Sequence, residues 1–115
     1  MIKEGQQKRA KYWGEFTVKK VVQLKAPEIA HSAEVGKALF NYTLVQIQWK
    51  ADGGYNFWFP YWVTIKGKER FGQYAPMMDE DSLLELLREA IRKEFFSKNF
   101  LNQLHQTITD KLNCK

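Results

Sequence analysis

Histidine and cysteine, two of the residue types most often used as general base or nucleophile, are scarce in this chain. The 115 residues include two histidines, His31 and His105, and one cysteine, Cys114. Acid–base or nucleophilic catalysis needs a histidine within hydrogen-bond reach of a nucleophile. Ser32 is next to His31 in the sequence, and adjacent residues do not face each other on a helix or a strand. We therefore predict no catalytic residues and a non-enzymatic protein.

Asp79, Glu80 and Asp81 are the one cluster of possible metal ligands. Carboxylate oxygens suit Mg²⁺ or Ca²⁺, but no EF-hand pattern surrounds these residues. They precede a predicted helix, whose dipole favours negative charge at its start. The glycine-containing stretches DGGYNF and KGKERFG match neither a P-loop nor a dinucleotide-binding pattern. The sequence therefore predicts no metal site and no cofactor.

Positive charge is concentrated near the start of the chain. The net charge is +5, and residues 1–25 alone hold seven Lys or Arg against two Glu, which is also +5. A basic segment beside a balanced body favours contact with a polyanion such as nucleic acid, although a solvated tail with a lysine-bearing strand face fits the same composition. The candidate nucleic-acid-binding residues are Lys8, Arg9, Lys11, Lys19, Lys20 and Lys25.

The stretch YNFWFPYWV, residues 55–63, holds six aromatic residues and no charge. Strand alternation assigns Tyr55, Phe57, Phe59 and Tyr61 to a core face and leaves the tryptophans on the other face. That second face could be covered by the N-terminal segment or the last helix, form a homodimer or partner interface, or stack bases. Its candidate stacking or interface residues are Trp58, Trp62, Gln46 and Gln48.

The elements that would position these residues begin with strands. Residues 11–24 are rich in aromatic and β-branched residues and predict a first strand. Residues 27–36 predict a short helix, because Pro27 suits a first turn, or else an irregular loop. Residues 42–75 alternate and contain two glycine turns, which predicts a three-stranded antiparallel meander.

The last third of the chain predicts helices. Ser82 and Glu85 have the spacing of a capping box, and an apolar stripe that includes Leu86 and Leu87 follows. A break near residues 97–99 would separate a second helix, which carries Leu104 on its apolar face, although one long helix is an alternative. The predicted fold is α+β: about four antiparallel strands, the N-terminal strand plus the meander, with the C-terminal helices packed on one face. The expected domains are a flexible basic arm over residues 1–10 and a single domain over residues 11–115.

Two details of the meander are specific enough to test. A three-residue loop, Asp52–Gly54, would pair Trp49 with Phe57 and place the strongly apolar residues on one face. Pro60 has no N–H to donate and is disfavoured inside a sheet. We therefore predict a bulge, a bend or a loss of pairing at Phe59–Pro60.

The predicted order over residues 13–96, strand–helix–strand–strand–strand–helix, is similar to that of ribosome-hibernation factors. Without the first strand it is similar to the double-stranded-RNA-binding domain. That domain has a lysine-rich start to its final helix, whereas the corresponding residues here read MMDEDSLL. This acidic start would repel phosphate, so contact of that kind is not expected.

We expect a small binding module that contacts nucleic acid, as RNA or single strands, through its basic N-terminal region and the tryptophan-bearing sheet face. The alternative is a protein-interaction or assembly subunit, a homodimer or a complex component, that uses Trp58 and Trp62. A single cysteine favours a reducing, cytoplasmic setting. No stretch is long and apolar enough to span a bilayer, so no membrane partner is expected.

Overall fold

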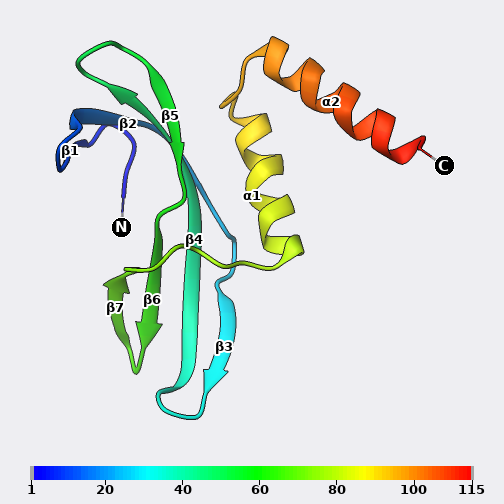
Figure 1. Cartoon of the computed structure of the whole chain (residues 1–115). Coiled ribbons are helices and arrows are strands. Elements are labelled where there is room, and N and C mark those ends of the chain that lie inside the picture. Colours follow the sequence, from blue (N-terminus) through cyan, green and yellow to red (C-terminus); the bar gives the residue numbers. More distant parts are fainter. Residues whose placement is uncertain (1, 115) are drawn as a thin grey trace.

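A seven-stranded antiparallel sheet and two helices make up residues 2–114, the part of the chain that the computed structural model describes (Figure 1). The α+β class and the antiparallel sheet are confirmed, but the sheet has more strands than the four expected and curls into a half-barrel. The elements are β1 (Gln7–Ala10), β2 (Gly14–Gln23), β3 (Glu28–Ser32), β4 (Gly36–Trp49), β5 (Tyr55–Trp58), β6 (Tyr61–Ile65), β7 (Lys68–Phe71), α1 (Glu80–Arg92) and α2 (Lys98–Leu112).

The long strand β4 organises the sheet. Its first half pairs with β3 on one side and β6 on the other, and its second half pairs with β2 and β5. Figure 1 shows β4 running through the centre, with hairpin turns at both ends. The outermost strands of the main path are β1, which pairs with β2, and β7, which pairs with β6. One end of the sheet therefore brings together β1, β2, β4 and β5, and the other end brings together β3, β4, β6 and β7.

The first third of the chain contains two strands in addition to the one expected. Four residues of the predicted arm, Gln7–Ala10, form β1, and Ile2 is buried in the core. The helix expected over residues 27–36 is wrong, because Glu28–Ser32 form a strand that makes a hairpin with β4. Gly36, at a φ of 77°, begins the returning strand. This strand occupies the place of the helix on which the resemblance to RNA-binding domains depended.

The register predicted for β4 and the aromatic strand is also wrong. Trp49 does not pair with Phe57; instead Gln48 pairs with Tyr55 and Val45 pairs with Trp58. The loop is longer than expected, because the Trp49 N–H donates to the Gly54 carbonyl at 2.9 Å. This register brings Trp58 and Trp62 to the face of Val45, and Phe57 to the face of Gln46. Both faces of the sheet are apolar, so the hydrophobic pattern did not determine which faces meet.

The break predicted at Pro60 is confirmed. β5 ends at Trp58 and β6 begins at Tyr61. The Pro60 carbonyl accepts two hydrogen bonds from Thr43, one from its N–H at 3.1 Å and one from its side-chain hydroxyl at 2.7 Å. Both bonds need only an acceptor from proline, so the lack of an N–H at Pro60 does not break the hydrogen bonding to β4.

Two hydrophobic cores lie on opposite faces of the sheet. The first lies under α1 and is built from Val22, Leu24, Tyr42, Leu44, Tyr61, Leu86, Ala90 and Phe95. The second is built from Ile2, Phe16, Val18, Val45 and Ile47, with Trp49, Trp58 and Trp62 packed against it. The predicted core face is therefore only partly correct: Tyr61 is buried in the first core, whereas Tyr55 and Phe57 are about half exposed.

The two helices differ in how they meet the sheet. α1 packs against β2 and β4, whereas α2 buries none of its residues and extends from the body (Figure 1). The N-cap of α1 is Asp79, which accepts a hydrogen bond from the Ser82 N–H at 2.7 Å, so the capping box expected at Ser82 is not the start of the helix. The predicted break is confirmed, with Ser97 as the N-cap of α2. The expectation that both helices pack on the sheet holds for α1 alone.

Candidate nucleic-acid interface

A cleft of about 490 Å³ lies where β1, β2, β4 and β5 meet. It combines predicted phosphate-binding residues with aromatic side chains of the second core. Its lining consists of Lys8, Arg9, Ala10, Phe16, Ile47, Trp49, Asn56, Phe57 and Trp58.

The aromatic floor of the cleft is held in place by its own packing. The Phe16 ring contacts the Trp49 and Trp58 indoles edge to face, with ring centroids 5.4 and 6.0 Å away. The Trp49 indole N–H also donates to the Asn56 side-chain oxygen. Phe16 is buried, while both tryptophans are partly exposed. Two indoles of fixed orientation therefore reach the surface of the cleft.

The cations of the cleft come from the β1 edge. Lys8 is the direct strand partner of Phe16, which places both on one face of the sheet. Lys8 and Arg9 are exposed, and neither takes part in the ion pairs found within residues 2–114. Arg9 is the direct strand partner of Glu15, so these two residues lie on the opposite face of the strand, where Glu15 is also paired with Lys50 at 3.3 Å. The cleft therefore offers the Lys8 ammonium to an anionic ligand from the face of Phe16, and Arg9 joins its lining from the next position of β1.

The turn between β1 and β2 extends this basic and aromatic surface. Tyr12 is 89% exposed and Trp13 is 78% exposed. The Lys11 ammonium lies 5.2 Å from the centre of the Tyr12 ring, within the range of a cation–π contact. The tip of this hairpin thus adds two exposed rings and a third cation beside the cleft.

The remaining predicted cations lie elsewhere. Lys19 and Lys20 line a separate cleft of about 580 Å³ beside Phe95 and Phe100. The Lys20 ammonium donates to the Glu94 carbonyl at 2.9 Å, so it holds the segment between the helices. The Lys25 backbone N–H donates to the Glu85 carboxylate at 2.9 Å, beside α1. The fold therefore divides the basic N-terminal region between two surfaces.

The predicted group of Trp58, Trp62, Gln46 and Gln48 is also divided. Trp62 packs on Phe71 with ring centroids 5.6 Å apart. Gln46 is buried on the other face, where its amide donates to the Phe95 carbonyl at 2.9 Å. The Gln48 amide donates to the Gly53 carbonyl at 3.0 Å. Of these four residues, only Trp58 lines the cleft with Lys8 and Arg9.

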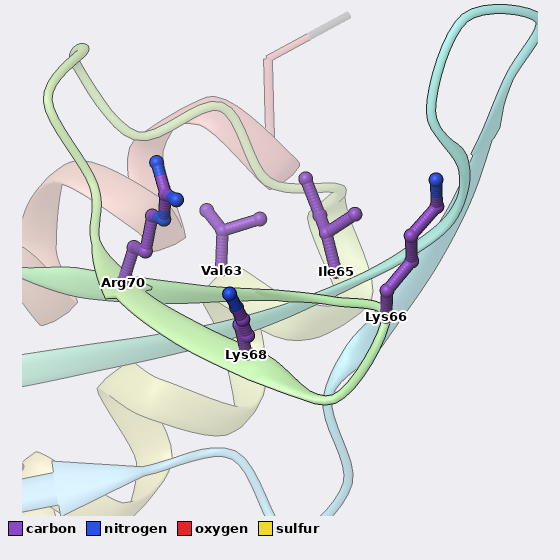
Figure 2. A pocket seen from close by; sticks show the side chains of 5 residues that line it. All are labelled: Val63, Ile65, Lys66, Lys68 and Arg70. Atoms are coloured by element: carbon purple, nitrogen blue, oxygen red, sulfur yellow. The ribbon is translucent and has the colours of Figure 1, made fainter.

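Sequence reasoning missed a second basic hollow, on the β6–β7 hairpin (Figure 2). Its volume is about 380 Å³, and it is lined by Val63, Ile65, Lys66, Lys68 and Arg70. Acidic residues elsewhere in residues 26–78 nearly balance these charges along the chain, so a count by segment conceals them. The signal was the two-residue spacing of Lys68 and Arg70 in β7, because every second residue of a strand lies on one face, with Lys66 in the adjoining turn.

Titratable groups with shifted pKa values lie away from both basic sites. The Lys93 ammonium, 2.6 Å from Glu4, and the Val21 N–H together lower the pKa of the Glu4 carboxyl. Burial raises the pKa of the Tyr42 phenol, whose O–H donates to the Met77 carbonyl at 2.6 Å. Bonds from the Ser82 N–H lower the pKa of Asp79. The three groups therefore hold the helices and the N-terminal segment in place, and none of them belongs to either basic site.

Within residues 2–114, no three His, Cys, Asp or Glu side chains lie close enough together to hold a metal ion. None of the helices described is both long and apolar enough to cross a membrane. Comparison with protein-family models, curated proteins and solved structures finds no match to this chain.

Proposed function

We propose that this protein binds single-stranded nucleic acid, RNA or DNA, in the cleft between β1 and β5. One observation carries the proposal: Lys8 and Arg9 line the same cleft as the Trp49 and Trp58 indoles. Non-specific single-strand sites combine a positive groove for the backbone with aromatic rings on which bases stack. The partly exposed indoles would take the bases, Lys8 on the same face would take a flanking phosphate, and Arg9 at the edge strand would take a neighbouring one.

Base stacking and phosphate contacts would respond differently to salt. Stacking of a base on an aromatic side chain contributes roughly 1–3 kcal/mol, independently of sequence. Each phosphate contact releases counterions, and binding of a single strand then weakens with a slope of about −0.7 per contact in log affinity against log salt. The exposed Tyr12 and Trp13 could extend the stacking surface to neighbouring bases.

A fluorescein-labelled oligothymidylate and its oligouridylate counterpart test the proposal by fluorescence anisotropy at low salt. Lys8→Ala with Arg9→Ala should weaken binding and reduce the salt slope by about 1.4 if both residues contact phosphate. Lys98→Ala with Lys111→Ala on α2 removes the same charge and should leave the affinity near that of the unmodified protein. Absence of binding by either oligonucleotide at low salt would contradict the proposal, as would equal losses in the two variants.

A second candidate function is self-assembly, favoured by the exposed apolar stripe of α2. Leu104 is 36% exposed, Ile108 49% and Leu112 79%, and these residues recur at intervals of four along the helix. The helix carries few charges, so a second copy of the same stripe would meet little repulsion. Light scattering over a range of concentrations tests this candidate. A dimer that Leu104→Asp with Ile108→Asp converts to folded monomer would support it, and a monomer at all concentrations would refute it.

A further inference from the structure

β7 is an edge strand with one side unpaired. It is the last strand of the main sheet path, and β6 is its one partner among the strands of residues 2–114. The Gly72 N–H donates to the Tyr61 carbonyl at 2.7 Å, which makes these residues a hydrogen-bonded pair. Such pairs alternate with non-bonded ones in antiparallel sheets, so the backbone groups of Phe71 and Glu69 point away from β6. No backbone partner for them is found within residues 2–114.

The same strand presents regularly spaced positive charge. Arg70 pairs with Val63 and Lys68 pairs with Ile65, so all four lie on one face of the hairpin. Figure 2 shows the two apolar side chains between the cations. Lys68 and Arg70 stand two residues apart, about 7 Å along a strand. The ion pairs found within residues 2–114 involve neither of them.

The turn that joins β6 to β7 holds a third cation in an unfavourable backbone conformation. Lys66 has a φ of 51° and Gly67 a φ of 78°, as in a type I′ turn. Gly, Asn and Asp are preferred at the first of these positions, because a side chain crowds the backbone there. Lysine at this position lowers local stability, and its ammonium lies at the rim of the hollow. A strained residue that brings a charge to a hollow indicates that the charge has a binding role.

We propose that the β7 edge binds an acidic, extended segment of a partner protein, which adds to the sheet as a further strand. The outward backbone groups of Glu69 and Phe71 hydrogen-bond to the added strand. Alternate carboxylates of that strand then face Lys68 and Arg70 above the apolar floor, and Lys66 contacts one more. No aromatic side chain of residues 2–114 lines this hollow, so it lacks the stacking surface that favours nucleic acid in the cleft at the other end of the sheet.

The test uses a fluorescein-labelled peptide of eight alternating glutamates and valines, measured by fluorescence anisotropy. Its glutamine–valine counterpart removes the charge, and a version with proline in place of each valine removes the N–H groups that would face β7. The glutamate–valine peptide should bind at least ten-fold more tightly than either control. Lys68→Ala with Arg70→Ala should abolish that preference, whereas Glu69→Ala, on the opposite face of the same strand, should retain it.

Lys66→Asn separates a binding role from a structural one. Asparagine suits the turn better, so the melting temperature should stay constant or rise while peptide affinity falls several-fold. Equal affinity of Lys66→Asn and the unmodified protein would overturn the role of Lys66. Equal binding of the glutamate and proline peptides, or no binding of either, would overturn strand addition. Displacement of the peptide by oligothymidylate that depends on Lys68 and Arg70 would assign the hollow to nucleic acid instead.

Discussion

The two helices have similar sequence patterns and different surroundings. α1 has 13 residues and buries Leu86 and Ala90 against the sheet. α2 has 15 residues with an apolar stripe that includes Leu104, yet none of its residues is buried. Helix stability in proteins comes mostly from packing of the apolar face. The comparison therefore shows that an amphipathic pattern predicts a helix but does not identify what covers its apolar side.

The segment between the helices explains why α1 packs on the sheet and α2 does not. Phe95 is buried in the first core, and Ser97 caps α2 two residues later. Glu94 adopts a φ of 60°, so the chain turns sharply before Phe95. The buried ring fixes the end of α1, and the chain beyond it leaves the sheet. α2 thus projects from an anchored point, and its apolar stripe stays accessible to a second copy.

The largest effect on stability is expected from Leu86→Ala. Leu86 is fully buried between α1 and the sheet, at 0% exposure. Truncation removes its contacts and leaves a cavity, which should lower the free energy of unfolding by roughly 2–5 kcal/mol. Chemical denaturation monitored by circular dichroism measures the change. A loss below about 1 kcal/mol would mean that α1 is not held by this core.

Gln46→Leu should have the next largest effect. The buried Gln46 amide donates to the Phe95 carbonyl and so fastens the segment between the helices to β4. Leucine has a similar size but leaves that carbonyl without its partner, at a cost of about 1–3 kcal/mol. Gln48→Leu is the matched control, since its bond to Gly53 lies at the surface and its loss should cost less. Urea denaturation measures both losses of stability. Equal losses would show that the buried hydrogen bond to Phe95 contributes no more to stability than the surface bond to Gly53.

These same residues show what could be predicted from the sequence. β2, the break at Pro60 and the separation of α1 from α2 follow from local signals: a β-branched run, a missing N–H and an interrupted stripe. The register of β4 did not follow, because Leu44 and Val45 are both buried, on opposite faces. Where both faces of a strand are apolar, alternation does not determine which one packs under the helix.

The candidate site was predictable to a similar degree. Lys8, Arg9 and Trp58 were identified as candidates, but their meeting in one cleft depends on β1, a strand that its polar sequence did not indicate. The basic hollow at Arg70 was missed because charge was summed along the chain and not by strand face. Charge patterns in β proteins are better read with the two-residue period of a strand.

A smaller effect is expected at the contact that ties the N-terminal segment to the end of α1. Lys93 lowers the pKa of Glu4 below its ordinary value of 4.5. A lowered pKa means that the folded state holds the charged form, so the stabilisation is present above about pH 4.5 and lost as the pH falls through the folded-state value. Both side chains are nearly half exposed, so Glu4→Gln should cost only about 0.2–1 kcal/mol at pH 7.

The measurement for this contact is thermal unfolding as a function of pH. The melting temperatures of Glu4→Gln and the unmodified protein should differ at pH 7, and the difference should shrink as the pH falls below about 4.5 and Glu4 becomes protonated. Lys3→Gln is a control for a change of one charge in the same segment, because Lys3 makes no ion pair within residues 2–114. A difference that stays constant as the pH falls through this range would assign the effect to packing and not to charge.

The smallest effect is expected from Leu104→Ala, the counterpart of Leu86→Ala on the second helix. Leu104 lies on the exposed stripe, so truncation in a monomer leaves no cavity and should change stability by no more than about 0.5 kcal/mol. Self-assembly changes this expectation, because a dimer that forms through α2 is stabilised by mass action. The melting temperature should then rise with protein concentration in the unmodified protein and rise less in Leu104→Ala. Measurements at two concentrations thus determine whether the exposed helix differs from α1 in having no covering surface or in receiving one from a second copy.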